Sequence, residues 1–115
     1  MRKFLAVALC VVSLPLAAQD CPVRLVQCAD PDDRSCPAEC RRDLSALGIS
    51  VVHTAGQEMS SLGGMWIGPP LLSPSMQRTI VINSAQRLCM QKQARHHERC
   101  HEALYLKTGS SWFHH

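Results

Sequence analysis

The residues best suited to chemistry in this 115-residue chain lie near its end, in the sequence His97-Glu98-Arg99-Cys100-His101. This H-E-x-x-H pattern predicts a metal site when it lies on a helix, because residues four apart share one helix face. Two imidazoles on one face can bind a single tetrahedral zinc ion (Zn2+). Glu98 is offset from both and can act as general base on a zinc-bound water molecule. His97 and His101 are therefore candidate metal ligands, and Glu98 is the candidate catalytic residue.

The motif must be positioned by a helix, and the surrounding residues predict one. Asn83-Ser84 are helix-capping types, and we expect a long helix from about Ala85 to Lys107. At about 100° per residue, both motif histidines fall within the apolar arc of this helix, although Gln93 interrupts that arc. The two histidines are therefore expected to face inward, with Glu98 flanking them.

The elements expected to support this helix are short. Residues 79–82 (Thr-Ile-Val-Ile) and 49–53 have strand-type composition, and the Gly-rich residues 62–68 are consistent with a third strand. A backing helix is expected over residues 37–47, which begin with proline and are followed by glycine. The pattern predicts an α+β fold with a backing helix, a short three-stranded sheet and a long C-terminal helix carrying the motif.

The first 18 residues have the features of a secretory signal peptide: a basic start, an apolar run over residues 4–16 and small residues at 17–18. The apolar run is shorter than the roughly 20 residues of a membrane-spanning helix. We therefore expect residues 1–18 to be removed, residues 19–115 to form a single domain, and the product to be secreted or periplasmic with no membrane anchor.

Removing 18 of the 115 residues leaves 97, with 10 basic and 9 acidic residues and a net charge of +1. A nucleic-acid or membrane-surface function usually requires a basic stripe, so neither partner is expected. Six cysteines also remain, and an even number in a short exported chain predicts up to three disulfides whose pairing is left open. These residues are Cys21, Cys28, Cys36, Cys40, Cys89 and Cys100.

Spacing limits the possible pairings. Cys89 and Cys100 are about 16 Å apart along one continuous helix, so they cannot bond to each other. We expect them to pair with the N-terminal segment or the backing helix, and Cys36 and Cys40 to have different partners. A reduced protein offers His96 and Cys100 as alternative metal ligands, which export disfavours.

A strand leading into a helix with His97-Glu98-x-x-His101 resembles the catalytic half of small zincin-type metallopeptidases, over about residues 37–115. The resemblance implies that the two histidines bind zinc, that Glu98 is the general base, and that the upstream edge strand aligns a peptide or protein substrate. It makes residues 19–115 a zincin-like domain with a cysteine-rich N-terminal segment. Only the helix motif is specific to the family.

The third zinc ligand departs from the larger zincin groups. Lys107 stands where metzincins have a histidine, and no acidic residue follows Glu102 to act as a gluzincin ligand. The C-terminal His114 or His115 has a spacing similar to that in SprT-like zincins, and we favour His114 over His115. The alternative for this pair is a chain end with no role in the site.

The expected function is hydrolysis of a peptide bond by a Glu98-activated, zinc-bound water molecule. The competing interpretation is a small cysteine-rich secreted protein that binds or inhibits another molecule, with non-catalytic histidines or a structural metal site. Both interpretations predict disulfides, so disulfides do not separate them. Measurements of metal content and of peptide cleavage separate the two interpretations.

Overall fold

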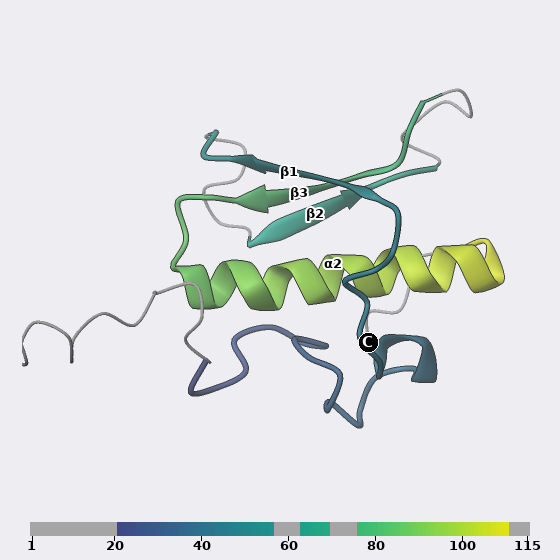
Figure 1. The fold of residues 1–115 in the computed structure, drawn as a ribbon, viewed down its shortest axis with the longest axis horizontal. Helices are drawn as coiled ribbons and strands as arrows, with labels where there is room; N and C mark the ends of the chain where they lie inside the picture. Colours follow the sequence, from purple (N-terminus) through teal and green to yellow (C-terminus); the bar gives the residue numbers. More distant parts are fainter. Residues whose placement is uncertain (1–20, 57–62, 70–75, 111–115) are drawn as a thin grey trace, which may run out of the picture.

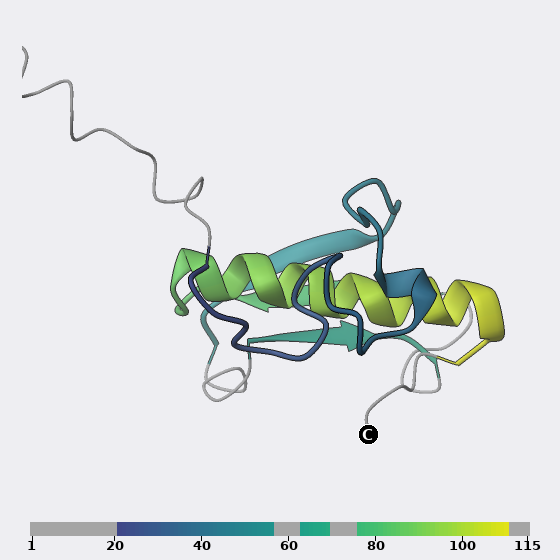
Figure 2. The same cartoon turned by 90° about the horizontal axis from the view of Figure 1, so that it is seen from below.

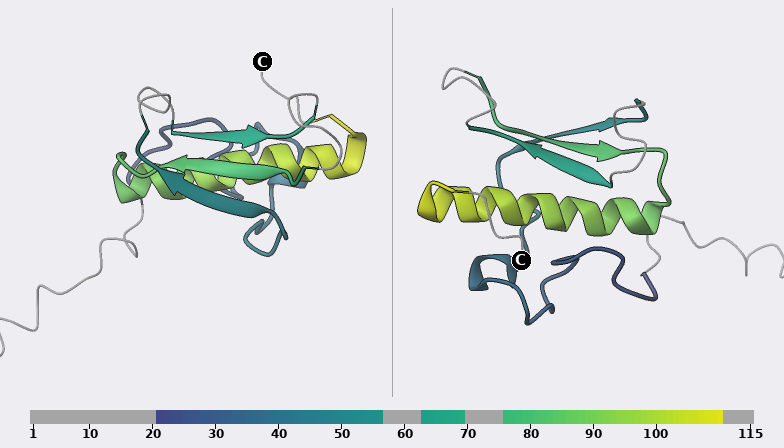
Figure 3. Two further views of the ribbon diagram at one scale, coloured as in Figure 1. Left: turned by 90° about the horizontal axis from the view of Figure 1, so that it is seen from above. Right: turned by 180° about the vertical axis from the view of Figure 1, so that it is seen from behind.

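The computed structural model of the chain describes residues 21–56, 63–69 and 76–110. Its central element is helix α2 (Leu88–Thr108), which lies between a three-stranded sheet and the irregular N-terminal segment (Figure 1). Views from above and behind show the same three layers (Figure 3). One long helix, one mixed sheet and three disulfides make a small α+β domain, as the sequence predicts. Among the described residues, no helix combines the length and apolar character needed to span a bilayer.

The sheet is built around β3 (Thr79–Asn83), in the order β1–β3–β2. Strand β1 (Ser50–Thr54) pairs parallel with β3, and β2 (Gly64–Ile67) pairs antiparallel with it. All three strands lie within two residues of the expected positions. Ile80 and Ile82 point to one face because strand residues alternate, and both are fully buried against α2. The sheet therefore places β2, an edge strand, along one side of the helix.

Helix α2 begins three residues later than the sequence predicts. The side chain of Asn83 accepts a hydrogen bond from the Ala85 amide and so forms a turn instead of a helix cap. The side chain of Gln91 donates to the carbonyl oxygens of Ser84 and Gln86, which ties this turn to the first turn of the helix. At the other end, Gly109 adopts a left-handed conformation and terminates the helix.

The prediction of a backing helix over residues 37–47 is wrong. Only a three-residue 3-10 helix, η2 (Ala38–Cys40), forms there. Beyond it, the carboxylate of Asp43 accepts a hydrogen bond from the Ser45 amide, a local bond that competes with helix formation. The buried Leu44 and the bonded cysteines still pack this segment against α2. Packing on the helix is therefore supplied by an irregular segment.

The domain has three disulfides: Cys21–Cys89, Cys28–Cys36 and Cys40–Cys100. The first and third link the N-terminal segment to α2, and Cys28–Cys36 lies within that segment. Both helix cysteines pair with residues of the N-terminal half, and Cys36 and Cys40 have different partners, as expected. Because Cys100 is bonded to Cys40, the alternative in which His96 and Cys100 bind a metal is wrong for this oxidised form. Three disulfides in so small a domain are typical of an oxidising, extracellular environment.

Candidate metal centre

Three side chains of the motif lie together on α2. One ligand atom each from His97, Glu98 and His101 lies within 4.8 Å of the others. The two imidazole Nε2 atoms are each 3.9 Å from a different carboxylate oxygen of Glu98. The imidazole rings themselves meet edge to face, with centroids 5.1 Å apart. This group could hold a metal ion, as the motif predicts.

The orientation of His97 is set by the N-terminal segment. Its Nδ1 forms a short hydrogen bond with the backbone carbonyl oxygen of Gln27. Since a carbonyl only accepts, Nδ1 carries the proton and Nε2 carries the lone pair. Hydrogen bonds of this kind orient the histidine ligands of metal sites and fix their tautomer. Gln27 is 70 residues away in the sequence, so no local pattern predicts this contact.

Glu98 lies against the edge strand β2. Its side chain is so close to Gly64 that a Cβ atom there would lie 3.1 Å from Glu98 Cγ. Burial raises the pKa of Glu98 to about 7, and a hydrogen bond from the Trp66 backbone amide acts in the opposite direction. A nearby dication would lower this pKa, because it stabilises the carboxylate. Glu98 is therefore a buried carboxylate facing the sheet, further inside than its expected flanking position.

One turn after the motif, a second buried carboxylate fixes β2 to the helix. Glu102 accepts hydrogen bonds from Nε and Nη2 of Arg78 at 3.0 Å each, and from Trp66 Nε1 at 3.0 Å. The Trp66 ring packs near His101 and Tyr105, with centroids 6.5 and 5.5 Å apart. Trp66 is thus connected to Glu98 through its backbone and to Glu102 through its side chain.

The disulfide Cys40–Cys100 anchors the motif from the opposite side. Cys100 is fully buried between the Glu98 and His101 positions of the motif, and it packs with Leu44 and Leu104. His96 Nε2 donates a hydrogen bond of 2.8 Å to the carbonyl oxygen of Cys40. The motif turn is therefore fixed to η2 by one covalent bond and one hydrogen bond.

Other potential ligands fall outside this group. His114, the expected third ligand, and His115 lie outside the described residues. Cys28, Asp33 and Cys36 also approach one another, but the Cys28–Cys36 disulfide occupies both sulfur atoms. The described part of the chain thus brings together two of the three expected metal ligands and the expected catalytic glutamate.

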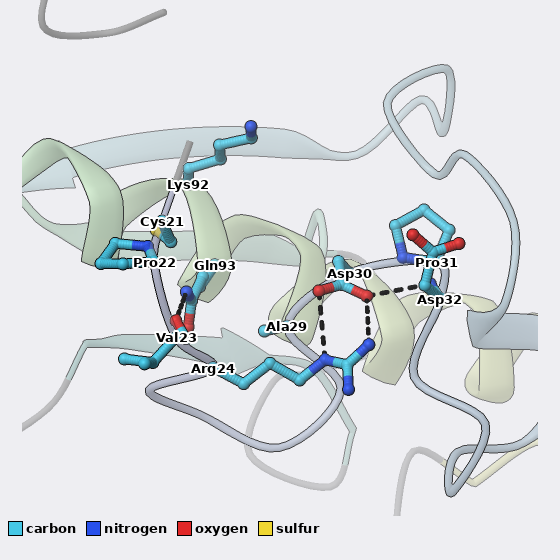
Figure 4. A pocket seen from close by; sticks show the side chains of 10 residues that line it. All are labelled: Cys21, Pro22, Val23, Arg24, Ala29, Asp30, Pro31, Asp32, Lys92 and Gln93. Atoms are coloured by element: carbon cyan, nitrogen blue, oxygen red, sulfur yellow. Dashed lines mark hydrogen bonds and ion pairs between the residues drawn. The ribbon is translucent and has the colours of Figure 1, made fainter. Parts of the chain in front are cut away.

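A cavity of about 540 Å³ lies next to the N-terminal segment and the first turns of α2 (Figure 4). The side chain of Gln93 accepts from the Leu25 amide and donates to the Val23 carbonyl at its wall. This explains how Gln93 can interrupt the apolar arc of the helix. The guanidinium of Arg24 and the carboxylate of Asp30 form an ion pair across the cavity. Two of its charged side chains are therefore paired with each other, and the motif does not line it.

No known protein family, curated protein or solved structure matches this chain. The zincin resemblance therefore rests on the motif residues alone, and the activity that it implies stays a prediction. Sequence reasoning overlooked Gln27, Arg78 and Glu102. The last two are 24 residues apart and carry no local signal, apart from the position of Glu102 directly after His101.

Proposed function

We propose that this chain is an exported zinc-dependent metallopeptidase in which His97 and His101 bind zinc and Glu98 is the general base. The observation that supports it most is the convergence of these three side chains on one side of α2. Export is supported by three disulfides in a small domain. His114 remains the proposed third ligand.

The donor set fits zinc. Two neutral imidazoles are preferred zinc ligands, and the bond between His97 Nδ1 and the Gln27 carbonyl presents Nε2 with its lone pair. Two nitrogen ligands at 2.0–2.1 Å on a tetrahedral ion are about 3.4 Å apart. Because the ligand atoms already lie within 4.8 Å of one another, small rotations of the side chains bring them to this separation.

The proposed chemistry divides between the ion and the chain. When bound, zinc lowers the pKa of a water molecule and polarises a scissile carbonyl. Glu98 takes the proton of the attacking water and delivers it to the leaving amine. Its position between both imidazole Nε2 atoms, 3.9 Å from each, suits that role.

The edge strand supports a peptide as substrate. An extended peptide can add to the edge of a sheet through main-chain hydrogen bonds. Strand β2 lies at an edge in the order β1–β3–β2, and Glu98 contacts it at Gly64 and Trp66. A peptide added to β2 would therefore pass near the carboxylate of Glu98.

The second candidate is a secreted binding or inhibitory protein with a structural metal site. It is favoured by the burial of the site, since Glu98 is 6% exposed and His101 is 8% exposed. Structural zinc sites are closed, whereas catalytic sites keep a position open to water and substrate. The two candidates therefore differ in whether a peptide reaches Glu98.

A cleavage assay with Glu98→Gln separates the two candidates. The zinc-loaded chain is incubated with a mixed peptide library, and products are followed by mass spectrometry. We expect Glu98→Gln to keep its zinc and to lose about 10²–10⁴-fold in rate, because the general base is gone. The matched control is Glu39→Gln, which changes a glutamate that pairs with Lys107 at the surface. This variant should cleave peptides at the rate of wild type.

Two outcomes would contradict the peptidase proposal. A wild-type chain that holds one zinc and cleaves no peptide would favour the structural-metal candidate. Equal cleavage by wild type and Glu98→Gln would show that Glu98 is not the base.

A further inference from the structure

A pair of arginines occupies the side of α2 away from the motif. Arg95 and Arg99 are four residues apart and share one helix face, about 160° around the helix axis from His97. Arg99 lies near Asp43, in the segment between η2 and β1. This segment and β2 lie on opposite sides of α2 (Figure 2). Both arginine side chains are only partly exposed.

Arg99 has an unsatisfied donor. Its Nε atom is buried and has no hydrogen-bond partner among the described residues. A buried donor without an acceptor is costly, and such groups in folded proteins usually have a partner such as an ion or an ordered water molecule. This atom therefore marks a place where an acceptor fits.

Arg95 carries an uncompensated charge. Its side chain is half-buried, and no carboxylate of the described residues forms an ion pair with it. Arginine remains protonated in proteins. Two neighbouring guanidinium groups thus repel each other on a partly buried surface.

The surroundings add positive charge. Arg41 and Arg42 are exposed on the segment that follows η2. The carboxylate near Arg99 is that of Asp43, which accepts a hydrogen bond from the Ser45 amide. This side of the molecule therefore has a local excess of positive charge, although the net charge of the mature chain is close to zero.

We propose that Arg95 and Arg99 form a binding site for a tetrahedral oxyanion, phosphate or sulfate. Planar guanidinium groups present several N–H donors in a fixed fork that matches the oxygen atoms of such anions. The bound anion would supply the acceptor that Arg99 Nε lacks and would screen the repulsion between the two arginines. The site is separate from the metal centre and does not rest on the proposed peptidase activity.

Calorimetric titration with inorganic phosphate tests this site. The oxidised chain is dialysed free of metal, so that phosphate has no zinc to bind, and ionic strength is held constant with chloride. We expect saturable binding of one phosphate, with competition by sulfate. Arg95→Gln and Arg99→Gln should each weaken binding at least about tenfold, because each removes charge-assisted hydrogen bonds.

The matched control is Arg34→Gln, which removes one positive charge from an exposed arginine elsewhere in the N-terminal segment. It should bind phosphate as wild type does. Circular dichroism identifies any variant that does not fold, and the arginine variant that keeps its fold then decides the result. The proposal is overturned if wild type shows no saturable phosphate binding, or if all three variants bind equally.

Discussion

At the scale of single residues, two buried carboxylates on successive turns of α2 meet the sheet differently. Glu98 lies between the two motif histidines, and its pKa is raised by burial. Glu102 is held by Arg78 and Trp66 through charge-assisted and indole hydrogen bonds. Glu98 has the position of a reacting group, and Glu102 holds β2 beside it.

The motif itself could be read from the sequence, because a helical spacing of four is a local property. The partners of these side chains could not be predicted from the sequence. Arg78, Trp66 and Gln27 reach the helix through the tertiary fold, and their spacing in the sequence bears no relation to their contacts. Sequence could therefore predict which atoms are candidate ligands but not what orients them.

Replacing Glu102 with Gln tests its positioning role. Gln keeps the size of the side chain but removes the charge that Arg78 and Trp66 contact, so we expect a loss of about 2 kcal/mol in the free energy of unfolding. Urea denaturation measures this loss. Glu39→Gln, at a surface ion pair screened by solvent, should change stability much less. Equal effects of the two substitutions would argue against the role of Glu102.

Gly64→Ala tests the close approach of β2 to the helix. An added Cβ would lie 3.1 Å from Glu98 Cγ, from Ile82 Cδ1 and from the Val81 carbonyl oxygen, so neighbours must shift. Overpacking of this kind typically costs about 1–3 kcal/mol. Thermal denaturation should show the loss, whereas Gly48→Ala meets nothing within 4 Å and serves as control. A fully stable Gly64→Ala would mean that β2 lies further from Glu98.

At the scale of elements, hydrophobic patterning predicts the three strands and the long helix but not the segment over 37–47. The strands contain β-branched runs such as Ile80-Val81-Ile82, whose packing agrees with their local preference. The segment over 37–47 has a helix-like composition, yet the Asp43–Ser45 hydrogen bond and the disulfides of Cys36 and Cys40 hold it in an irregular form. Local preference was overridden there by side-chain bonding and covalent links.

The disulfides of α2 provide a matched pair of tests. Cys21–Cys89 and Cys40–Cys100 span 68 and 60 residues, so loop-closure entropy predicts a similar loss of about 4 kcal/mol for removing either one. Only Cys100 lies inside the motif. We therefore expect Cys40→Ser/Cys100→Ser to weaken zinc binding at least about tenfold beyond Cys21→Ser/Cys89→Ser.

Zinc affinity in a competition assay, with folding followed by circular dichroism, measures both effects. If the two double variants bind zinc equally well, the Cys40–Cys100 disulfide does not position the ligands.

At the scale of the whole molecule, the fold is a sheet and an irregular segment on opposite sides of one helix. The apolar core is divided accordingly, with Ile80, Ile82 and Ala94 on the sheet side and the bonded cysteines with Leu44 and Leu104 on the other. Each half is small, so covalent links and buried polar contacts carry much of the stability. The candidate metal centre, His97, Glu98 and His101, lies where the helix meets both layers.

Acid should lower the stability of the fold through Asp33, which lies in the N-terminal segment. Its carboxylate accepts from the Ser35 hydroxyl and from the Ser35 and Cys28 amides, and the hydroxyl bond is the main cause of its lowered pKa. A lowered folded-state pKa contributes stability that is present above the unfolded value of about 3.9 and is lost as pH falls through the folded value. Urea denaturation between about pH 5 and pH 2 should therefore show a smaller pH dependence in Asp33→Asn than in wild type. An unchanged slope would contradict this assignment.

The measurement that tests the metal centre most directly is the zinc content of the purified, oxidised chain by elemental analysis. We predict one zinc per chain in wild type and in the control His53→Ala, whose histidine is exposed on β1. His101→Ala should lose the metal while keeping its three disulfides. Wild-type protein without zinc after equilibration with the ion, or His101→Ala with a full zinc equivalent, would contradict the proposed site.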